Sequence, residues 1–114
     1  MSDCIFCKII KGEIPSELVY ENDYVIAFYD ISPQAPVHIL VVPKEHIASV
    51  ADITADNSLF AAKCYEAIAE IAKTLKLDKG FRVIANTGSD GGQTVFHLHF
   101  HLLGGRSFGP GLTR

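Results

Sequence analysis

Residues 95–103 read Val95-Phe-His-Leu-His-Phe-His-Leu-Leu103, and this strict alternation is the strongest structural signal in the chain. A period of two predicts a β-strand, which sends alternate side chains to opposite faces. One face would then be apolar, and the other would carry His97, His99 and His101 at intervals of about 6.5–7 Å. Polar strand positions usually hold Thr, Lys, Glu or Ser, so three imidazoles in a row indicate a chemical site rather than packing alone.

Length and composition predict one globular domain over residues 1–114, with a core at about 5–106 and a C-terminal tail at 107–114. The net charge of −3 argues against non-specific binding to nucleic acid, so any anion must be held by local geometry. The sequence has no apolar run of membrane-spanning length and no signal peptide, which predicts a cytoplasmic protein without membrane contacts. Three cysteines, an odd number, argue against a disulfide framework.

Two helices are predicted by caps and by spacing. A short helix from Cys4 to Lys11 would be capped by Asp3, and Gly12 would end it. A long helix from about Asp56 to Lys76, capped by Thr54 or Asp52, would turn an apolar stripe toward the core. That stripe, at spacings of three and four, consists of Phe60, Cys64, Ala67, Ile68, Ile71 and Leu75.

Five strands are expected, at Glu17–Glu21, Tyr24–Tyr29, His38–Pro43, Phe81–Asn86 and Val95–Leu103. The strand His38–Pro43 is apolar on both faces, so it should be central in the sheet. Short connections favour antiparallel pairing. The expected fold class is therefore α+β, an antiparallel meander of about five strands with the helices on one face.

A glycine-rich loop, Asn86-Thr-Gly-Ser-Asp-Gly-Gly-Gln-Thr94, leads directly into the histidine segment. Glycines let successive amides point the same way, which makes a concavity that binds anions. The loop matches neither the Walker pattern nor the dinucleotide fingerprint, because no Lys-Ser/Thr follows it and no helix begins there. Amides and imidazoles around one tetrahedral anion suit phosphoryl or nucleotidyl transfer.

The segment His97-Leu-His-Phe-His-Leu-Leu103 resembles the signature of the histidine triad (HIT) superfamily. The wider similarity is to its Hint branch, the histidine triad nucleotide-binding proteins, and it covers the chain from Ile5 to Arg106. The motifs that carry it, besides the triad, are Asp30-Ile-Ser-Pro-Gln-Ala-Pro-Val-His38, Val42-Pro-Lys-Glu-His-Ile47, Asn86, Gly88-Ser-Asp-Gly-Gly-Gln-Thr94 and Leu103-Gly-Gly-Arg106.

The resemblance implies a HIT-like homodimer whose sheet continues across the two-fold axis. It implies hydrolysis of purine nucleoside 5′-phosphoramidates through a covalent nucleotidyl-histidine intermediate, with no cofactor needed for catalysis. The residue it makes the nucleophile is His99, and His38 and His97 would orient that imidazole. The nucleotide contacts it implies are His101 and the backbone of Gly92, Gln93 and Thr94 for phosphate, Asn86 for phosphate or ribose, and Asp30 for the ribose hydroxyls. The slot for the base would be formed by Ile5, Phe6, Ile9, Phe28, Ile31 and Leu40.

The pair Cys4-x-x-Cys7 is a weak signal alone, because a tetrahedral zinc site needs two more ligands. Several HIT relatives with such a pair bind structural zinc through two histidines, which correspond here to His46 and His97. The alternative is that both cysteines are ordinary helix residues buried in the core. Some relatives also end in a Trp-Pro-Pro-Gly tail that reaches the partner's site, and the tail here has no Trp, so leaving-group preference stays open.

Two other functions compete with the hydrolase. One is a module that binds a purine nucleotide without turning it over. The other is a metalloenzyme that uses His-x-His as two ligands, although His97 and His101, about 13 Å apart on a strand, could not share one ion.

Overall fold

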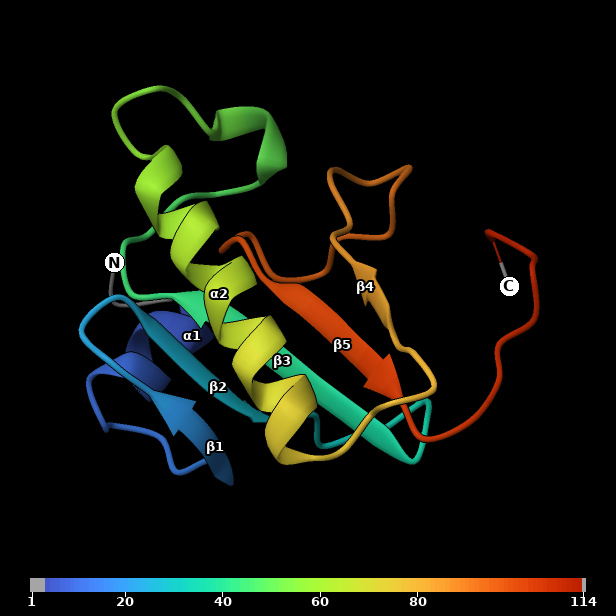
Figure 1. Ribbon diagram of the computed structural model, residues 1–114. Coiled ribbons are helices and arrows are strands. Elements are labelled where there is room, and N and C mark those ends of the chain that lie inside the picture. Colours follow the sequence, from blue (N-terminus) through green and yellow to red (C-terminus); the bar gives the residue numbers. More distant parts are fainter. Residues whose placement is uncertain (1–3, 114) are drawn as a thin grey trace.

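The computed structural model of the chain describes residues 4–113 and consists of one antiparallel sheet with a helix on each face (Figure 1). The elements are α1 (Ile5–Ile10), β1 (Leu18–Glu21), β2 (Val25–Tyr29), β3 (Val37–Pro43), the 3-10 turn η1 (Val50–Asp52), α2 (Ser58–Thr74), β4 (Arg82–Ile84) and β5 (Phe100–Gly104). The predicted α+β class, with five antiparallel strands and two helices, is confirmed. No helix within residues 4–113 is long and apolar enough to cross a bilayer.

The strand order is β1-β2-β3-β5-β4, so the predicted meander holds only as far as β3. The chain forms β4 at the edge first and then returns through the glycine-rich loop, which inserts β5 between β3 and β4. As a result β3 is central, as predicted, and it pairs with the last strand. The pairing sets Leu40 opposite His101 and His38 opposite Leu103. Two histidines that are far apart in the sequence therefore become neighbours on one face.

The strand predicted over residues 95–103 begins only at Phe100, so the prediction is wrong for residues 95–99. Two of these residues hydrogen-bond to the end of β3 and to the chain that follows it instead of forming a ladder. The Leu98 N–H donates to the Ile47 carbonyl, and the His97 imidazole reaches the Pro43 carbonyl at 2.9 Å. Contacts of side chains and loops override the extended propensity of the segment here.

The long helix α2 covers one face with the apolar stripe that the sequence predicts. Cys64, Ala67, Ile68 and Ile71 are buried on it and pack against residues of β2, β3 and β5. The helix begins at Ser58, later than predicted, and neither Thr54 nor Asp52 caps it. The preceding residue, Asn57, instead uses its side chain to bond backbone groups of residues 52 and 54.

The short helix α1 covers the opposite face, which corrects the expectation that both helices share a face. Phe6 packs there with Ile26 and Phe28 of β2 and Leu40 and Val42 of β3. Because β2 and β3 are apolar on both faces, each face needs a cover. The predicted cap Asp3 lies outside the described residues, and Cys4 stands at the N-cap with its sulfur accepting from the Cys7 N–H at 3.3 Å.

Candidate active site

The three triad imidazoles do not form a row, because they point to two different places. His97 is fully buried and turns its ring toward the N-terminus of α1, where it meets Cys4 and Cys7. His99 and His101 lie on the α1 face of the sheet with their ring centroids 5.1 Å apart. The triad therefore divides into one histidine that joins a cysteine cluster and two that adjoin each other.

The orientation of His99 is set by a backbone carbonyl. Its Nδ1 lies 2.7 Å from the His97 carbonyl oxygen, and since a carbonyl only accepts, Nδ1 carries the proton. Nε2 therefore holds a lone pair. It has no hydrogen-bond partner within residues 4–113. Because no fully buried side-chain nitrogen or oxygen there lacks a partner, Nε2 is not fully buried, although His99 as a whole is only 6% exposed. The edge of Phe6, with ring centroids 5.0 Å apart, helps to hold the ring.

A chain of hydrogen bonds also settles the protonation of His101. The Gln34 N–H donates to Nδ1 of His38 at 3.0 Å, which leaves the His38 proton on Nε2. That Nε2–H donates in turn to Nδ1 of His101 at 2.9 Å. The proton of neutral His101 is therefore on Nε2. The site thus places one imidazole acceptor, on His99, beside one imidazole donor, on His101.

Burial favours the neutral form of these imidazoles. It lowers the pKa of His101 to about 4, and the nearby His99 and His38 add to this effect while Asp30 opposes it. Burial also lowers the pKa of His97 to about 4, against the hydrogen bond to Pro43. The pKa of His38 is lowered by burial in the same way, and Asp30 works against the shift. The donor and acceptor roles of His38 and His101 described above therefore persist at neutral pH.

We expect acid to destabilise the folded protein between pH 6.5 and about 4, partly through His101. Below pH 6.5 the imidazole of His101 binds a proton in the unfolded chain but not in the folded chain. The free energy of unfolding that this residue contributes above pH 6.5 is therefore lost as the pH falls toward about 4. Urea unfolding across this range should give a falling free energy of unfolding, with a shallower fall in His101→Asn. The comparison separates His101 from the other titrating groups, and equal slopes in the two proteins would contradict the prediction.

The glycine-rich loop is braced by a buried side chain, that of Gln93. Its Oε1 accepts from the Gly88 N–H at 3.0 Å, and its Nε2 donates to the carbonyls of Ala48 and Val95. The loop also uses two of the amides predicted to hold phosphate. The Gln93 N–H donates to the Gly88 carbonyl at 3.0 Å, and the Gly92 N–H donates to the Ser89 carbonyl at 3.1 Å.

These bonds close the loop through the amides of Gly92 and Gln93, and the phosphate role given to the backbone of these residues stays a prediction. The amide of Thr94 has no partner within residues 4–113, and its exposed side chain lines a hollow of about 300 Å³ with Cys4, Ile5, Val95 and Phe96. Of the three amides predicted to hold phosphate, that of Thr94 is therefore the one that the loop's own hydrogen bonds leave available to an anion.

Gly91 is the position in this loop where a side chain cannot fit. A Cβ there would lie 2.9 Å from the Thr87 nitrogen and closer still to the Thr87 oxygen. We expect Gly91→Ala to lower the free energy of unfolding by about 1–3 kcal/mol, as overpacking does, and to weaken nucleotide binding. Urea denaturation measures the first effect. Ser89→Ala, at an exposed position of the same loop, is the control, and equal stability of the two variants would refute the steric argument.

Another predicted nucleotide contact, Asp30, lies close to the histidine pair, with its carboxylate within 4.8 Å of ring nitrogens of His38 and His101. Asp30 follows β2, with Oδ1 accepting from the Ser32 N–H at 2.7 Å and Oδ2 3.5 Å from Nε2 of His38. Ile31 is 98% exposed beside it. Asn86 is half-buried, and its side chain makes no hydrogen bond within the described part of the chain. The ribose and phosphate roles given to these residues stay predictions.

The residues predicted to form a base slot differ in exposure, and their role toward a base stays a prediction. Phe6, Phe28 and Leu40 are 6%, 4% and 7% exposed and pack against one another, with Ile9 beside them. Ile5, by contrast, is 45% exposed and faces the hollow next to Thr94. The aromatic and aliphatic cluster therefore forms an apolar floor against the His99 ring.

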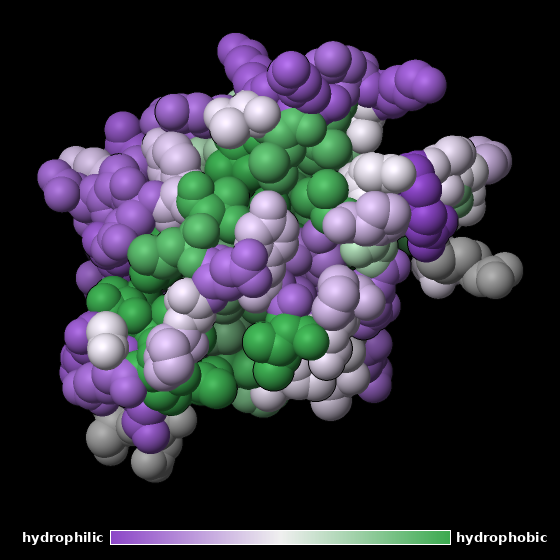
Figure 2. All heavy atoms as spheres, turned by 90° about the horizontal axis from the view of Figure 1, so that it is seen from below, coloured by the Kyte–Doolittle hydropathy of each residue, from purple (hydrophilic) through white to green (hydrophobic). Residues whose placement is uncertain are grey.

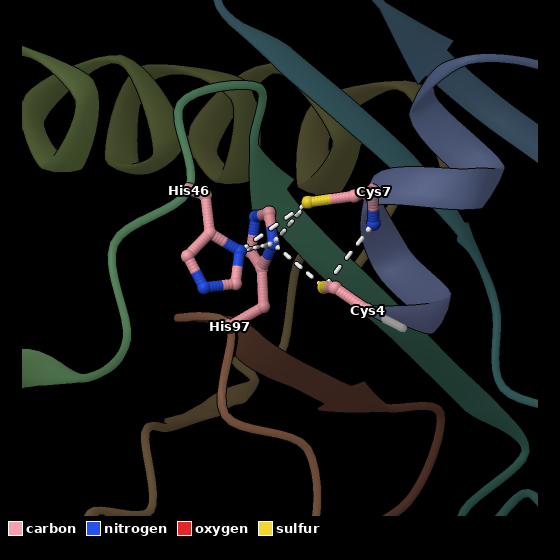
Figure 3. Close-up of side chains that lie close together, drawn as sticks. All are labelled: Cys4, Cys7, His46 and His97. Atoms are coloured by element: carbon pink, nitrogen blue, oxygen red, sulfur yellow. Dashed lines mark hydrogen bonds between the residues drawn. The ribbon is translucent and has the colours of Figure 1, made fainter. Parts of the chain in front are cut away.

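Cys4, Cys7, His46 and His97 converge on one point, with their ligand atoms within 4.8 Å of one another (Figure 3). Nδ1 of His97 lies 3.3 Å from the Cys4 sulfur and 3.6 Å from the Cys7 sulfur. Nδ1 of His46 lies 3.3 Å from the Cys7 sulfur and 3.0 Å from Nδ1 of His97. In a tetrahedral zinc site, bonds of about 2.0 Å to nitrogen and 2.3 Å to sulfur place ligand atoms about 3.3–3.8 Å apart.

The chemistry of this four-residue cluster also fits zinc. Nε2 of His97 donates to the Pro43 carbonyl at 2.9 Å, so the lone pair of Nδ1 faces the two sulfurs. A carbonyl partner on the far nitrogen is the usual way to orient a metal-binding histidine. Two cysteines and two histidines are a common ligand set for structural zinc.

The His-x-His metalloenzyme alternative is not favoured by this geometry. His97 and His99 face different surroundings, and His99 belongs to neither group of potential metal ligands within residues 4–113. The second such group, Asp30, His38 and His101, is already joined by the hydrogen bond from His38 to His101. That bond accounts for the proximity of these side chains without an ion.

Sequence reasoning missed the backbone groups that decide the protonation of each imidazole. They are the amide of Gln34 and the carbonyls of Pro43 and His97. Only the turn-forming segment around Gln34 carries a local signal, because Asp30 and Ser32 bond within it. Every residue has a backbone carbonyl, so the residue types do not show which carbonyl will accept a hydrogen bond from an imidazole.

The comparisons with known proteins agree with this geometry. Residues 11–108 match the family model described as HIT domain. The chain is 48% identical over 109 residues to the purine nucleoside phosphoramidase of Escherichia coli, covering 95% of this chain and 92% of that protein. It is 51% identical over 105 residues to an uncharacterized HIT-like protein of Synechococcus elongatus, covering 92% of each.

Solved structures show the same relationship. A HIT family hydrolase from Clostridium thermocellum superposes with a TM-score of 0.96 at 50% identity, covering 98% of each chain. A histidine triad protein from Clostridium difficile gives a TM-score of 0.91 at 53% identity, covering 95% of each. The fold, the histidine segment and these similarities over nearly the whole chain place this protein in the HIT domain family.

Proposed function

We propose that the protein hydrolyses purine nucleoside 5′-phosphoramidates through a nucleotidyl-histidine intermediate on His99. The observation that carries the proposal is the lone pair on Nε2 of His99, an atom that has no hydrogen-bond partner within residues 4–113 and is not fully buried, while the Nδ1–H is held by a carbonyl. The similarity to the E. coli purine nucleoside phosphoramidase supports the substrate class.

In the first step, Nε2 of His99 donates its lone pair to phosphorus, and the P–N bond of the substrate breaks. The substrate nitrogen takes up a proton from the solvent, which makes it a good leaving group, and it leaves as the amine with the electron pair of the P–N bond. The histidine in this intermediate carries a positive charge, because Nδ1 keeps its proton. The His97 carbonyl, 2.7 Å from Nδ1, stabilises that charge where it develops.

In the second step, water attacks the same phosphorus, and the new P–N bond to His99 breaks. The electron pair returns to Nε2, the attacking water gives up a proton to the solvent, the nucleoside monophosphate leaves, and the imidazole regains its starting form. Two displacements replace one, which is the general advantage of covalent catalysis. No metal is needed in either step.

The groups around His99 can bind the charged part of the substrate. The Nε2–H of neutral His101 is a donor for a phosphoryl oxygen, and the amide and hydroxyl of Thr94 are further donors. Asp30 lies on the other side of His38, where its carboxylate can accept from ribose hydroxyls. In this proposal His38 is a positioning residue that acts through His101.

We further propose that Cys4, Cys7, His46 and His97 hold a structural zinc ion. Zinc would contribute folding free energy and no chemistry of the reaction. It would tie the start of α1 to the segment after β3 and to the segment before β5. Since the His97 carbonyl orients His99, such a site would also stabilise the nucleophile's position.

A homodimer, which the family resemblance implies, is the proposed assembly. β1 and β4 are the edges of the sheet, and an edge strand offers unpaired backbone groups to a second copy. Viewed from below, the molecule also presents a continuous apolar tract bordered by polar side chains (Figure 2). Sedimentation velocity on the purified chain tests this proposal, and a monomer at all concentrations would contradict it.

Mass spectrometry after rapid acid-free quenching tests the main proposal. With an adenosine 5′-phosphoramidate substrate, the mass of one adenylyl group should appear on a peptide that contains His99. Tandem fragmentation should place it on His99 and not on His101 or His97. Turnover with no adduct on any histidine, or an adduct on another histidine, would overturn the assignment.

A further inference from the structure

Residues 95–99 lead into the candidate active site without support from a strand ladder. Because β5 begins only at Phe100, the sheet does not fix the backbone of this segment. Two bonds tie its later part to the end of β3 and the chain beyond, one from the Leu98 N–H and one from the His97 imidazole. The start of the segment, next to the glycine-rich loop, needs a tie of its own.

The side chain of Gln93 supplies that tie. It is 6% exposed, and its Nε2 donates to the Val95 carbonyl at 3.0 Å and to the Ala48 carbonyl at 2.7 Å. Its Oε1 accepts from the Gly88 N–H at 3.0 Å, in the loop that Figure 1 draws in orange between β4 and β5. One amide group therefore joins the glycine-rich loop, the segment before β5 and the segment after β3.

These three bonds use every donor of the Gln93 side chain. A primary amide has two N–H groups, and both are directed at backbone carbonyls. The side chain therefore has no hydrogen left to donate to a phosphoryl oxygen. Glutamine is also the residue that the pattern demands, because glutamate has the acceptor without the donors and methionine has neither. The amide thus acts on the backbone and not on a ligand.

Groups that the proposed reaction uses lie within and just beyond the stretch that this side chain holds. Thr94, whose amide the loop's own bonds leave available, stands between Gln93 and Val95. Two residues after Val95, the His97 carbonyl accepts the Nδ1–H of His99 at 2.7 Å. Loss of the bond to the Val95 carbonyl would therefore loosen the chain both at Thr94 and toward the carbonyl that orients the nucleophile.

We propose that Gln93 is a positioning residue of the hydrolytic site, whose side-chain amide keeps Thr94 and the His97 carbonyl in the places that attack by His99 requires. The inference rests on the proposed hydrolysis and extends it to a side chain that touches no substrate. Displacement of reacting groups by about 1 Å can cost about 10²-fold in rate. Loss of the amide should therefore act mainly on kcat, and much less on ground-state binding.

Gln93→Met tests the proposal, because methionine has a similar length and makes none of the three bonds. Well below the Tm of every variant, kcat for an adenosine 5′-phosphoramidate should fall about 10²-fold, while KM and the affinity for AMP change little. Ile68→Ala is the matched control, since it also lowers stability but does so by loss of packing on α2. It should keep the parent kcat. A kcat of Gln93→Met equal to that of Ile68→Ala would make the amide merely structural and overturn the proposal.

Gln93→Glu is the second variant, and it keeps the shape of the side chain. As a carboxylate it cannot donate to the Ala48 and Val95 carbonyls, but as a carboxylic acid it regains one donor. Burial beside carbonyl oxygens raises the pKa of such a group. The ratio of its kcat to that of the parent should therefore be low at about pH 8 and rise toward about pH 5.5, with circular dichroism showing folded protein throughout. A ratio that does not change with pH would overturn the proposal.

Nuclear magnetic resonance separates this proposal from the proposed reaction, because it needs no turnover. In protein labelled with nitrogen-15 histidine, the Nδ1–H of His99 should exchange slowly with water in the parent and in Ile68→Ala. In Gln93→Met it should exchange about tenfold faster, as local opening does. Equal exchange in the two variants would overturn the positioning role even in an active enzyme. If the parent hydrolyses no phosphoramidate, only the proposed function fails, and faster exchange in Gln93→Met still supports the positioning role.

Discussion

Replacing His99 by alanine should reduce hydrolysis of an adenosine 5′-phosphoramidate by about 10⁴-fold or more, as loss of a covalent nucleophile does. The reason is structural, since no other imidazole at the site has a free lone pair. Nδ1 of His101 accepts from His38, and His97 is buried in the cysteine cluster. Affinity for AMP should fall far less, because His101 and Thr94 remain. Steady-state kinetics and AMP titration of the same preparation measure both effects.

His101→Asn is the comparison for this experiment. Loss of one donor to a developing phosphoryl charge costs about 10²–10³ in kcat, which is less than loss of the nucleophile. The two variants should therefore differ in size of effect, and only His99→Ala should abolish the adenylyl adduct. An unchanged rate of phosphoramidate hydrolysis in His99→Ala would contradict the assignment as an enzyme and favour the non-catalytic nucleotide-binding module. This conclusion would hold whatever the affinity for AMP.

The predictions that succeeded rest on patterns that packing alone enforces. The stripe of α2 was predictable because a helix on a sheet must bury positions three and four apart, and Cys64 is an ordinary member of it. Burial raises the pKa of that thiol to about 12, in keeping with an unreactive core residue. The central place of β3 followed from its two apolar faces.

The predictions that failed concern contacts between segments distant in the sequence. Alternation through residues 95–103 predicts a strand, but the Pro43 and Ile47 carbonyls draw residues 97 and 98 out of the ladder. β2 and β3 are apolar on both faces, so each face of the sheet needs a helix to cover it. The sequence patterns of the two helices do not by themselves show that the helices lie on opposite faces.

Removing one ligand of the cysteine–histidine cluster should make the protein markedly less stable. For an ion present at about 1,000 times its Kd, loss of binding costs about 4 kcal/mol, which for a domain of this size lowers Tm by about 15 °C. Cys7→Ser is the best variant, because Cys7 is buried and contacts both His46 and His97. Elemental analysis should find one zinc per chain in the parent protein and none in Cys7→Ser. Thermal unfolding with and without a chelator measures the change in Tm.

Cys64→Ala provides the matched control, since it also removes a buried thiol but lies on α2 outside the cluster. Its Tm should fall through loss of packing, while its zinc content and its response to chelator should equal those of the parent. Cys7→Ser should show the reverse, with a low Tm that chelator does not lower further. Because the His97 carbonyl orients His99, chelation should also slow hydrolysis without preventing the adduct. A parent protein that contains no metal and keeps its Tm in chelator would show that hydrogen bonds alone hold the four side chains together.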